Sequence, residues 1–195
     1  MAQITRESLL TLEAYSKARA EFRSRVIAHK KSRIVTLGMH VTLLFEDELT
    51  IRYQIQEMLR AERIFDDEGI QGELDAYNPL VPDGSNWKAT MLIEYPDESE
   101  RRKMLAKLKG IEDRVWLQVQ GHTKVYAIAD EDLERENEEK TSSVHFLRFE
   151  LDLQMVSALK GGASLGAGID HPEYTVTLDA LDAEVTASLT RDLTA

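Results

Sequence analysis

The chain has 195 residues, of which 35 are acidic and 24 basic, so its formal net charge is −11, and it contains no cysteine. Without thiols it cannot be a disulfide-stapled scaffold, a cysteine-ligated zinc or iron–sulfur protein, or an enzyme with a cysteine nucleophile. The acidity also disfavours nucleic acid as a partner, because an acidic surface repels a polyanion.

The first third of the chain predicts a helix, a strand and a second helix. Thr5 is a suitable cap for a helix that runs to about Lys30, with apolar residues at roughly helical spacing. Residues 39–46 alternate in polarity, as the residues of a strand do. Helical spacing returns over residues 50–67, and Glu62 falls inside the apolar arc of this second helix.

The rest of the chain predicts an alternation of strands with shorter helices. Further strands are predicted at residues 88–95, 114–120, 123–129, 143–151, 164–170 and 174–178, and further helices at 97–110, 153–160 and 182–193. Several neighbouring strands are joined by very short turns, which only antiparallel pairing permits. The predicted fold class is therefore α+β, with a largely antiparallel sheet covered by helices in a single compact domain over residues 1–195.

One short motif resembles the nucleophile elbow of serine hydrolases, G-x-S-x-G, and reads GASLG around Ser164. The elbow places its serine on a tight turn from a strand into a helix, whereas here the helix is predicted before the serine and the strand after it. A triad would also require Asp170 and His171, adjacent in sequence, to act together. A glycine-rich helix stop is the favoured interpretation, and a serine hydrolase is the alternative.

The histidines offer a second kind of chemistry. His40 and His145 lie in predicted strands beside large apolar residues, and Glu94 ends a third such strand. If these strands are neighbours, their side chains converge with Glu62 from the second helix. The metal site predicted in this way consists of His40, Glu62, Glu94 and His145, a ligand set that suits iron, manganese or zinc. The alternative is that each histidine is hydrogen-bonded to a neighbour and binds no ligand.

Positive charge is concentrated near the N-terminus. Residues 17–33 carry seven basic side chains against one acid, Glu21, so this segment has a net charge of +6 and the rest of the chain −17. The segment either contacts an anion, nucleotide or RNA, or docks onto acidic neighbours such as residues 130–139, in its own subunit or in a partner. Docking is favoured, because single-stranded nucleic acid needs interleaved aromatic side chains that the segment largely lacks.

Several stretches resemble a bacterial family known only as a domain of unknown function, namely residues 25–31, 40–47, 53–60, 73–79 and 140–150. The resemblance extends from about Ile4 to Leu193, and its motifs include His40, Glu57, His145 and Glu150. Genes of that family are often found beside genes for rubrerythrin-like diiron proteins and iron–sulfur oxidoreductases. The resemblance therefore implies an accessory protein in oxidative-stress or iron-linked redox metabolism. It assigns no catalytic residue.

Three functions follow from these observations. The favoured one is an accessory binding protein that holds a metal ion or small ligand through histidine and carboxylate side chains. The alternatives are an acid–base or serine hydrolase with a histidine–carboxylate pair, and a structural protein that docks onto another protein or a second copy through its basic N-terminal helix. The chain has no apolar run of about 18 residues and no signal-peptide pattern in residues 1–14, so a cytoplasmic location without membrane contact is expected.

Overall fold

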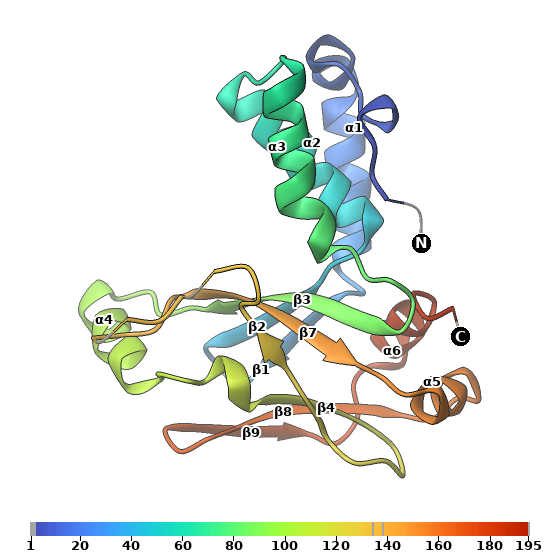
Figure 1. Cartoon of the computed structure of the whole chain (residues 1–195). Coiled ribbons are helices and arrows are strands. Elements are labelled where there is room, and N and C mark those ends of the chain that lie inside the picture. Colours follow the sequence, from blue (N-terminus) through green and yellow to red (C-terminus); the bar gives the residue numbers. More distant parts are fainter. Residues whose placement is uncertain (1–2, 134, 138, 195) are drawn as a thin grey trace.

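The computed structural model describes residues 3–133, 135–137 and 139–194. Three helices stand on one side of a pair of β-sheets (Figure 1). We call these three helices the helical arm, and they are α1 (Leu12–Lys30), α2 (Glu48–Glu62) and α3 (Asp67–Tyr77). No helix in the described part of the chain is both long and apolar enough to cross a membrane.

The two sheets contain only antiparallel strand pairs. The first sheet has the order β1-β2-β3-β7-β6, and its strands are β1 (Ile34–Leu37), β2 (Val41–Phe45), β3 (Asn86–Ile93), β7 (Val144–Glu150) and β6 (Ile128–Ala129). The second has the order β5-β4-β8-β9, and its strands are β5 (Val125–Tyr126), β4 (Val115–Val119), β8 (Leu165–His171) and β9 (Tyr174–Leu178). The α+β fold with antiparallel sheets is therefore confirmed.

Shorter helices close the ends of the sheets. They are α4 (Glu98–Lys107), α5 (Leu153–Lys160) and α6 (Ala183–Thr190). The described residues also form the 3-10 turns η1 (Arg6–Ser8), η2 (Asn78–Leu80) and η3 (Glu112–Arg114), of which η1 lies against α3 in the helical arm. Asp97 caps α4 by accepting a hydrogen bond from the Glu100 backbone N–H at 2.8 Å, as the capping pattern in the sequence predicts.

The main apolar core lies between the two sheets and follows from strand alternation. On β3, Trp87, Ala89 and Met91 are buried on the face that meets the second sheet, while Lys88 and Thr90 point to the other face. Fully burying a large apolar side chain contributes about 1.5–3 kcal/mol to folding. Trp87 also donates its indole N–H to the Leu189 carbonyl at 2.9 Å, which fixes α6 against the core.

The helical arm has a separate, smaller apolar cluster, formed by Ile4, Ile51, Ile55, Leu59, Leu74 and Val81. Within the described part of the chain, helix α1 contacts this cluster only through the partly buried Leu12 at its start, and of its 19 residues only Tyr15 and Val26 are buried. It is joined to α2 by polar and aromatic contacts, in which Tyr15 donates to Glu57 at 2.6 Å and Phe22 stacks on Tyr53.

The arm is attached to the sheets through a buried arginine. Arg33 is 1% exposed and donates to the Phe45 carbonyl at 2.9 Å and to the Asp192 carboxylate at 2.5 Å. Its guanidinium also lies 3.5 Å from Asp47, the cap of α2, which is held in turn by His29 at 2.5 Å. One cation thus links the end of α1, the start of α2 and the C-terminal segment.

Several boundaries differ from the sequence prediction, and β1 and α3 were not predicted. The first long helix starts at Leu12 and not at Thr5, because the Thr11 hydroxyl accepts from the Ala14 backbone N–H and caps it there. Thr5 begins only the short turn η1. Strand β1 alternates in burial but not in polarity, because its exposed residue Ile34 is apolar. Helix α3 contains two glycines and has a single buried residue, so packing on the arm stabilises it more than helix propensity does.

Candidate functional site

His145 lies on β7 with its side chain between the two sheets. Burial alternates along this strand, so His145 shares the inner face with Leu147 and Phe149 and is 0% exposed. A histidine in such a position must have hydrogen-bond partners, because an unpaired buried polar group is costly.

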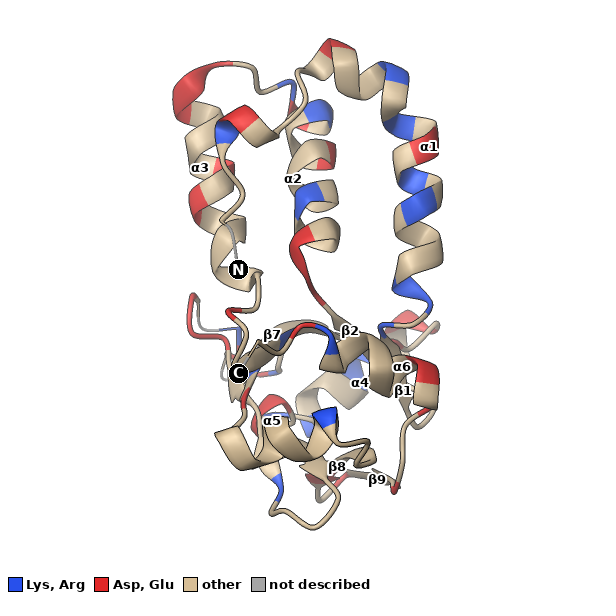
Figure 2. Ribbon diagram, turned by 90° about the vertical axis from the view of Figure 1, so that its right-hand side faces the viewer, with Lys and Arg blue, Asp and Glu red and all other residues tan. Residues whose placement is uncertain are grey.

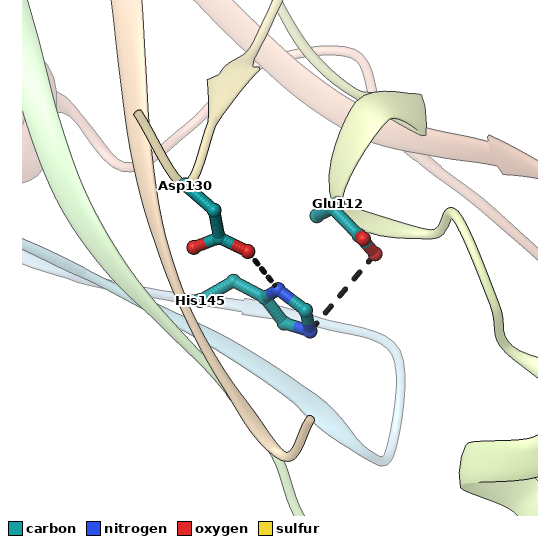
Figure 3. Close-up of side chains that lie close together, drawn as sticks. All are labelled: Glu112, Asp130 and His145. Atoms are coloured by element: carbon teal, nitrogen blue, oxygen red, sulfur yellow. Dashed lines mark hydrogen bonds and ion pairs between the residues drawn. The ribbon is translucent and has the colours of Figure 1, made fainter. Parts of the chain in front are cut away.

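Asp130 supplies the first partner. It directly follows β6 and has a positive φ of 48°, a conformation that aspartate tolerates better than most residues. Hydrogen bonds to β7 hold it there, because its backbone N–H donates to the Phe146 carbonyl and its Oδ1 accepts from the Phe146 N–H, both at 2.9 Å. Its Oδ2 accepts from Nδ1 of His145 at 2.6 Å (Figure 3).

This contact assigns the two ring nitrogens of His145. A carboxylate can only accept, so Nδ1 carries a proton and Nε2 bears the lone pair whenever the ring is neutral. The Thr141 hydroxyl lies 3.0 Å from Nε2, and the Ser142 backbone carbonyl 3.1 Å from it. Nε2 is therefore surrounded by oxygen atoms.

Glu112 is the third member of the group and comes from η3. It is 8% exposed, and its Oε2 has no hydrogen-bond partner among the described residues. This atom lies 3.9 Å from Nε2 of His145, on the side of the ring away from Asp130 (Figure 3). Burial raises the pKa of the Glu112 carboxyl above its ordinary value. The chain thus holds an unsatisfied carboxylate oxygen near the Nε2 side of a buried imidazole.

A second layer of ion pairs fixes the segments that carry these groups. Arg135 lies 3.1 Å from Asp130 and stacks on the Phe146 ring, with 4.5 Å between its guanidinium carbon and the ring centroid. Glu136 accepts from the Gly110 backbone N–H at 2.9 Å, two residues before Glu112. The Asp130 and Glu112 segments are therefore tied to each other outside the cluster as well as at His145.

Glu112, Asp130 and His145 form the candidate metal site. Their ligand atoms lie within 4.8 Å of one another, and no other group of three or more histidine or acidic side chains in the described part of the chain comes this close together. Histidines that bind metals commonly donate their other ring N–H to a carboxylate, as His145 does to Asp130. This arrangement leaves Nε2 and Glu112 as the groups that face a cation.

Comparison with known proteins identifies the family. Residues 3–193 match the family described as "Protein of unknown function (DUF3501)". The chain belongs to this family. A crystal structure of a protein of unknown function from Burkholderia pseudomallei K96243 is 62% identical to it, with a TM-score of 0.95, and the match covers 99% of this chain and 100% of that one. No curated protein matches the chain.

Membership in DUF3501 confirms the resemblance to an uncharacterised family. The expected gene neighbourhood stays an expectation. Because neither the family nor the Burkholderia protein has an assigned function, the comparisons transfer no functional residue to this chain.

Of the four metal ligands predicted from sequence, only His145 lies in the cluster. The structure brings His40 and Glu94 together, but through the Glu94 backbone carbonyl, which lies 2.9 Å from Nδ1 of His40. The Glu94 carboxylate accepts from Thr42 at 2.8 Å. Glu62 is exposed at the end of α2, in the helical arm. None of the described contacts joins these residues to His145.

Sequence reasoning did not find Glu112 or Asp130, and the physical reason is clear in each case. Asp130 begins the acidic run of residues 130–139, so the pattern of a solvated loop concealed it. Glu112 lies in a turn of three residues that has no periodicity to read. His145 was found because alternation along a seven-residue strand indicates its burial.

The serine motif does not assemble a catalytic triad. Ser164 precedes β8 and His171 ends it, and seven residues of extended chain separate them by roughly 23 Å. His171 faces the Lys109 carbonyl at 3.0 Å, while Asp170 accepts from Lys124 at 2.8 Å. The glycine-rich helix stop is what the structure shows, since α5 ends at Lys160 before the motif begins.

Among the described residues, no ion pair joins the basic segment to residues 130–139 of the same chain. In that acidic segment, Glu131 pairs with Arg148, Asp132 with Arg135 and Glu136 with Lys109. Glu134 and Glu138 lie outside the described residues. Lys and Arg residues recur along α1 on the outside of the arm (Figure 2). Docking onto a second molecule stays a prediction.

Proposed function

We propose that this protein is an accessory protein that binds one first-row divalent metal ion between Glu112 and His145. The observation that carries the proposal is the buried Oε2 of Glu112, which has no partner among the described residues and lies 3.9 Å from Nε2 of His145. Asp130, at 2.6 Å from Nδ1, orients the ring and fixes its tautomer.

A cation between these two atoms would remove a cost that the protein otherwise bears. An unsatisfied buried polar group costs about 1–3 kcal/mol, and more when it is charged. Glu112 Oε2 and His145 Nε2 are now 3.9 Å apart. To form bonds of roughly 2.0–2.2 Å to the same metal ion, they would have to move closer to each other by less than about 1 Å. The Thr141 hydroxyl and the Ser142 carbonyl, which also face Nε2, are further oxygen donors.

The donor set favours iron(II), manganese(II) or zinc(II). It consists of one imidazole nitrogen and several oxygens, because the chain has no thiol. Iron(II) also fits the iron-linked redox setting that the resemblance to the family implies. In that setting the protein would hold or deliver iron beside redox enzymes and would carry no thiol chemistry itself.

Burial favours metal binding over hydrolysis at this site. Asp130, His145 and Thr141 follow one another in the hydrogen-bonding order of a hydrolase triad. Thr141 is only 1% exposed and His145 0%, so a substrate carbonyl cannot reach the hydroxyl. A metal ion needs far less space.

Metal titration of protein purified without a histidine tag tests the proposal. After removal of metals with a chelator, the protein is titrated with iron(II), manganese(II) and zinc(II) under anaerobic conditions, and bound metal is counted by mass spectrometry. We expect one equivalent in the wild type and a loss of about 100-fold or more in affinity in Glu112→Gln and His145→Gln.

Two further variants serve as controls. His171→Gln changes another buried histidine that faces a backbone carbonyl, and we expect its metal affinity to equal that of the wild type. His40→Gln tests the ligand set predicted from sequence. Failure of the wild type to bind any of the three metals at millimolar concentration would sink the proposal, and so would wild-type affinity in a folded Glu112→Gln variant.

A further inference from the structure

A second feature lies on the opposite face of the first sheet, away from the metal cluster. Here a cavity of about 290 Å³ opens between η2, β3, β7 and the segment that follows β6. Helix α3 ends directly above this face of the sheet (Figure 1). The walls are mainly apolar and are formed by Pro79, Leu80, Ile128 and Phe146.

Two cations enter this cavity from neighbouring strands. Lys88 on β3 and Arg148 on β7 are paired in the register of the sheet, so both side chains leave the same face. The Arg148 charge is already neutralised, because its guanidinium donates to both oxygens of Glu131, at 2.6 and 2.7 Å, and also to Glu150.

Lys88 differs from Arg148 in having no ion pair among the described residues. Its ammonium group donates to the Pro79 backbone carbonyl, and Lys88 forms no ion pair within the described residues. Burial holds the pKa of Lys88 below its ordinary value, although the nearby carboxylates of Asp83, Glu131 and Glu150 act in the opposite direction. Lys88, a half-buried ammonium beside apolar walls, is therefore the one charged residue of the described cavity lining without an ion pair, since Glu131 pairs with Arg148 and Asp132 with Arg135.

We propose that this cavity binds a small monocarboxylate with an apolar body, whose carboxylate pairs with Lys88. The apolar walls would cover the body of the ligand, and the carboxylate would form the ion pair that Lys88 lacks. A ligand pocket normally has about 300–1,000 Å³, so this cavity suits a ligand at the small end of that range. The proposal is independent of the metal site.

The lining also indicates which ligands the cavity rejects. Glu131 and Asp132 are already paired with arginines, so Lys88 is the only cation of the described lining that is available for an ion pair with a ligand. A dicarboxylate or a phosphate would bring a second negative charge that no cation of the described lining could pair with. A neutral analogue of the same shape would leave the ammonium unpaired and bind less tightly.

Titration with benzoate and with hexanoate at low salt tests the proposal. Binding is monitored by nuclear magnetic resonance, through the backbone amide signals of β3, β7 and η2. Each acid is compared with its neutral amide, benzamide or hexanamide. We expect saturable shifts at these elements for the acids and an affinity lower by about tenfold or more for the amides. Lys88→Met should weaken acid binding by a similar factor, and Lys88→Arg should restore most of it.

Lys124→Met is the matched control, because it removes a lysine from the second sheet, where it pairs with Asp170 at 2.8 Å. It should leave benzoate binding unchanged. Three results would overturn the proposal: no saturable shift for either acid at 10 mM, equal affinity for acid and amide, or wild-type acid affinity in a folded Lys88→Met variant. The last two would show that Lys88 only fastens η2 to the sheet.

Discussion

At the scale of single residues, the cluster at His145 combines two neighbours with opposite consequences. Asp130 satisfies one ring nitrogen and stabilises the buried ring, whereas Glu112 presents an oxygen without a partner among the described residues. Proteins accept such a cost where function requires it. This contrast separates the structural from the functional interpretation of the cluster, because a purely structural histidine has no need of Glu112.

Glu112→Gln should therefore stabilise the metal-free protein at pH 8. The pKa of Glu112 is raised above its model-compound value of 4.5 in the folded state, so the native state loses stability as the pH rises from 4.5 through the folded pKa. We expect the variant to exceed the wild type by about 1 kcal/mol in unfolding free energy at pH 8, and to lose this advantage below pH 4.5. Urea unfolding at the two pH values measures the difference, and a less stable variant at pH 8 would contradict it.

Asp130→Asn should weaken metal binding and preserve the fold. Asparagine also tolerates the positive φ at this position, and its single side-chain oxygen can accept from the ring N–H if the hydrogen bond from the Phe146 backbone N–H is lost. The loss of negative charge makes His145 a poorer ligand, so we expect metal affinity to fall by about 10- to 100-fold. Calorimetric titration checks this, with circular dichroism as the control for folding. Unchanged affinity would show that Asp130 does not act on the metal through the ring.

At the scale of elements, helix α1 depends on one carboxylate of α2. Glu57 accepts from Tyr15 at 2.6 Å and from Arg19 at 2.7 and 2.8 Å. The sequence indicates that Glu57 and Arg60 form an i,i+3 pair, and they lie 3.7 Å apart, but nothing in the helical pattern indicates that Glu57 also binds α1. Such contacts between helices depend on tertiary structure, which periodicity does not report.

The attachment of α1 should weaken in acid. Hydrogen bonds from Arg19 lower the pKa of Glu57 from 4.5 to about 2, so the stability that this contact contributes is present above pH 4.5 and is lost as the pH falls towards 2. We expect amide exchange in α1 to accelerate between pH 5 and pH 3, after correction for intrinsic rates, before exchange in β3 does. Glu57→Gln should show fast exchange at both pH values, and Glu62→Gln, exposed on the same helix, should behave as the wild type. Equal protection of α1 at both pH values in the wild type would contradict this prediction.

At the scale of the whole molecule, strand alternation predicts an antiparallel α+β fold but not its division into two sheets. Alternation indicates which face of a strand is buried, but it does not indicate which other element packs against that face. Strand β8 is buried on both faces, so it lacks the alternation that β3 shows. Its Gly168 is needed because a Cβ atom there would lie 2.3 Å from the Trp116 ring. Such close approaches are visible only in three dimensions.

Arg33, which attaches the helical arm to the sheets, is the residue whose substitution we expect to lower the unfolding free energy most. Arg33→Met would leave the Asp47 and Asp192 carboxylates without their buried cation. Removing one partner of a buried ion pair costs about 3–5 kcal/mol, and we expect a loss of this size in the unfolding free energy at pH 7. Arg23→Met, an exposed change on α1, should cost less than about 0.5 kcal/mol. If Arg33→Met lowered the unfolding free energy no more than Arg23→Met does, the charge of Arg33 would not be what attaches the arm to the sheets.

The central claim, a metal ion held by Glu112 and His145, is tested most directly by anomalous diffraction. Crystals soaked in manganese(II) or zinc(II) should show one strong anomalous peak within roughly 2.0–2.4 Å of both Glu112 Oε2 and His145 Nε2, with Asp130 still bonded to Nδ1. The peak should disappear in Glu112→Gln crystals. A peak beside His40 and Glu94, or no peak within bonding distance of His145, would contradict the claim.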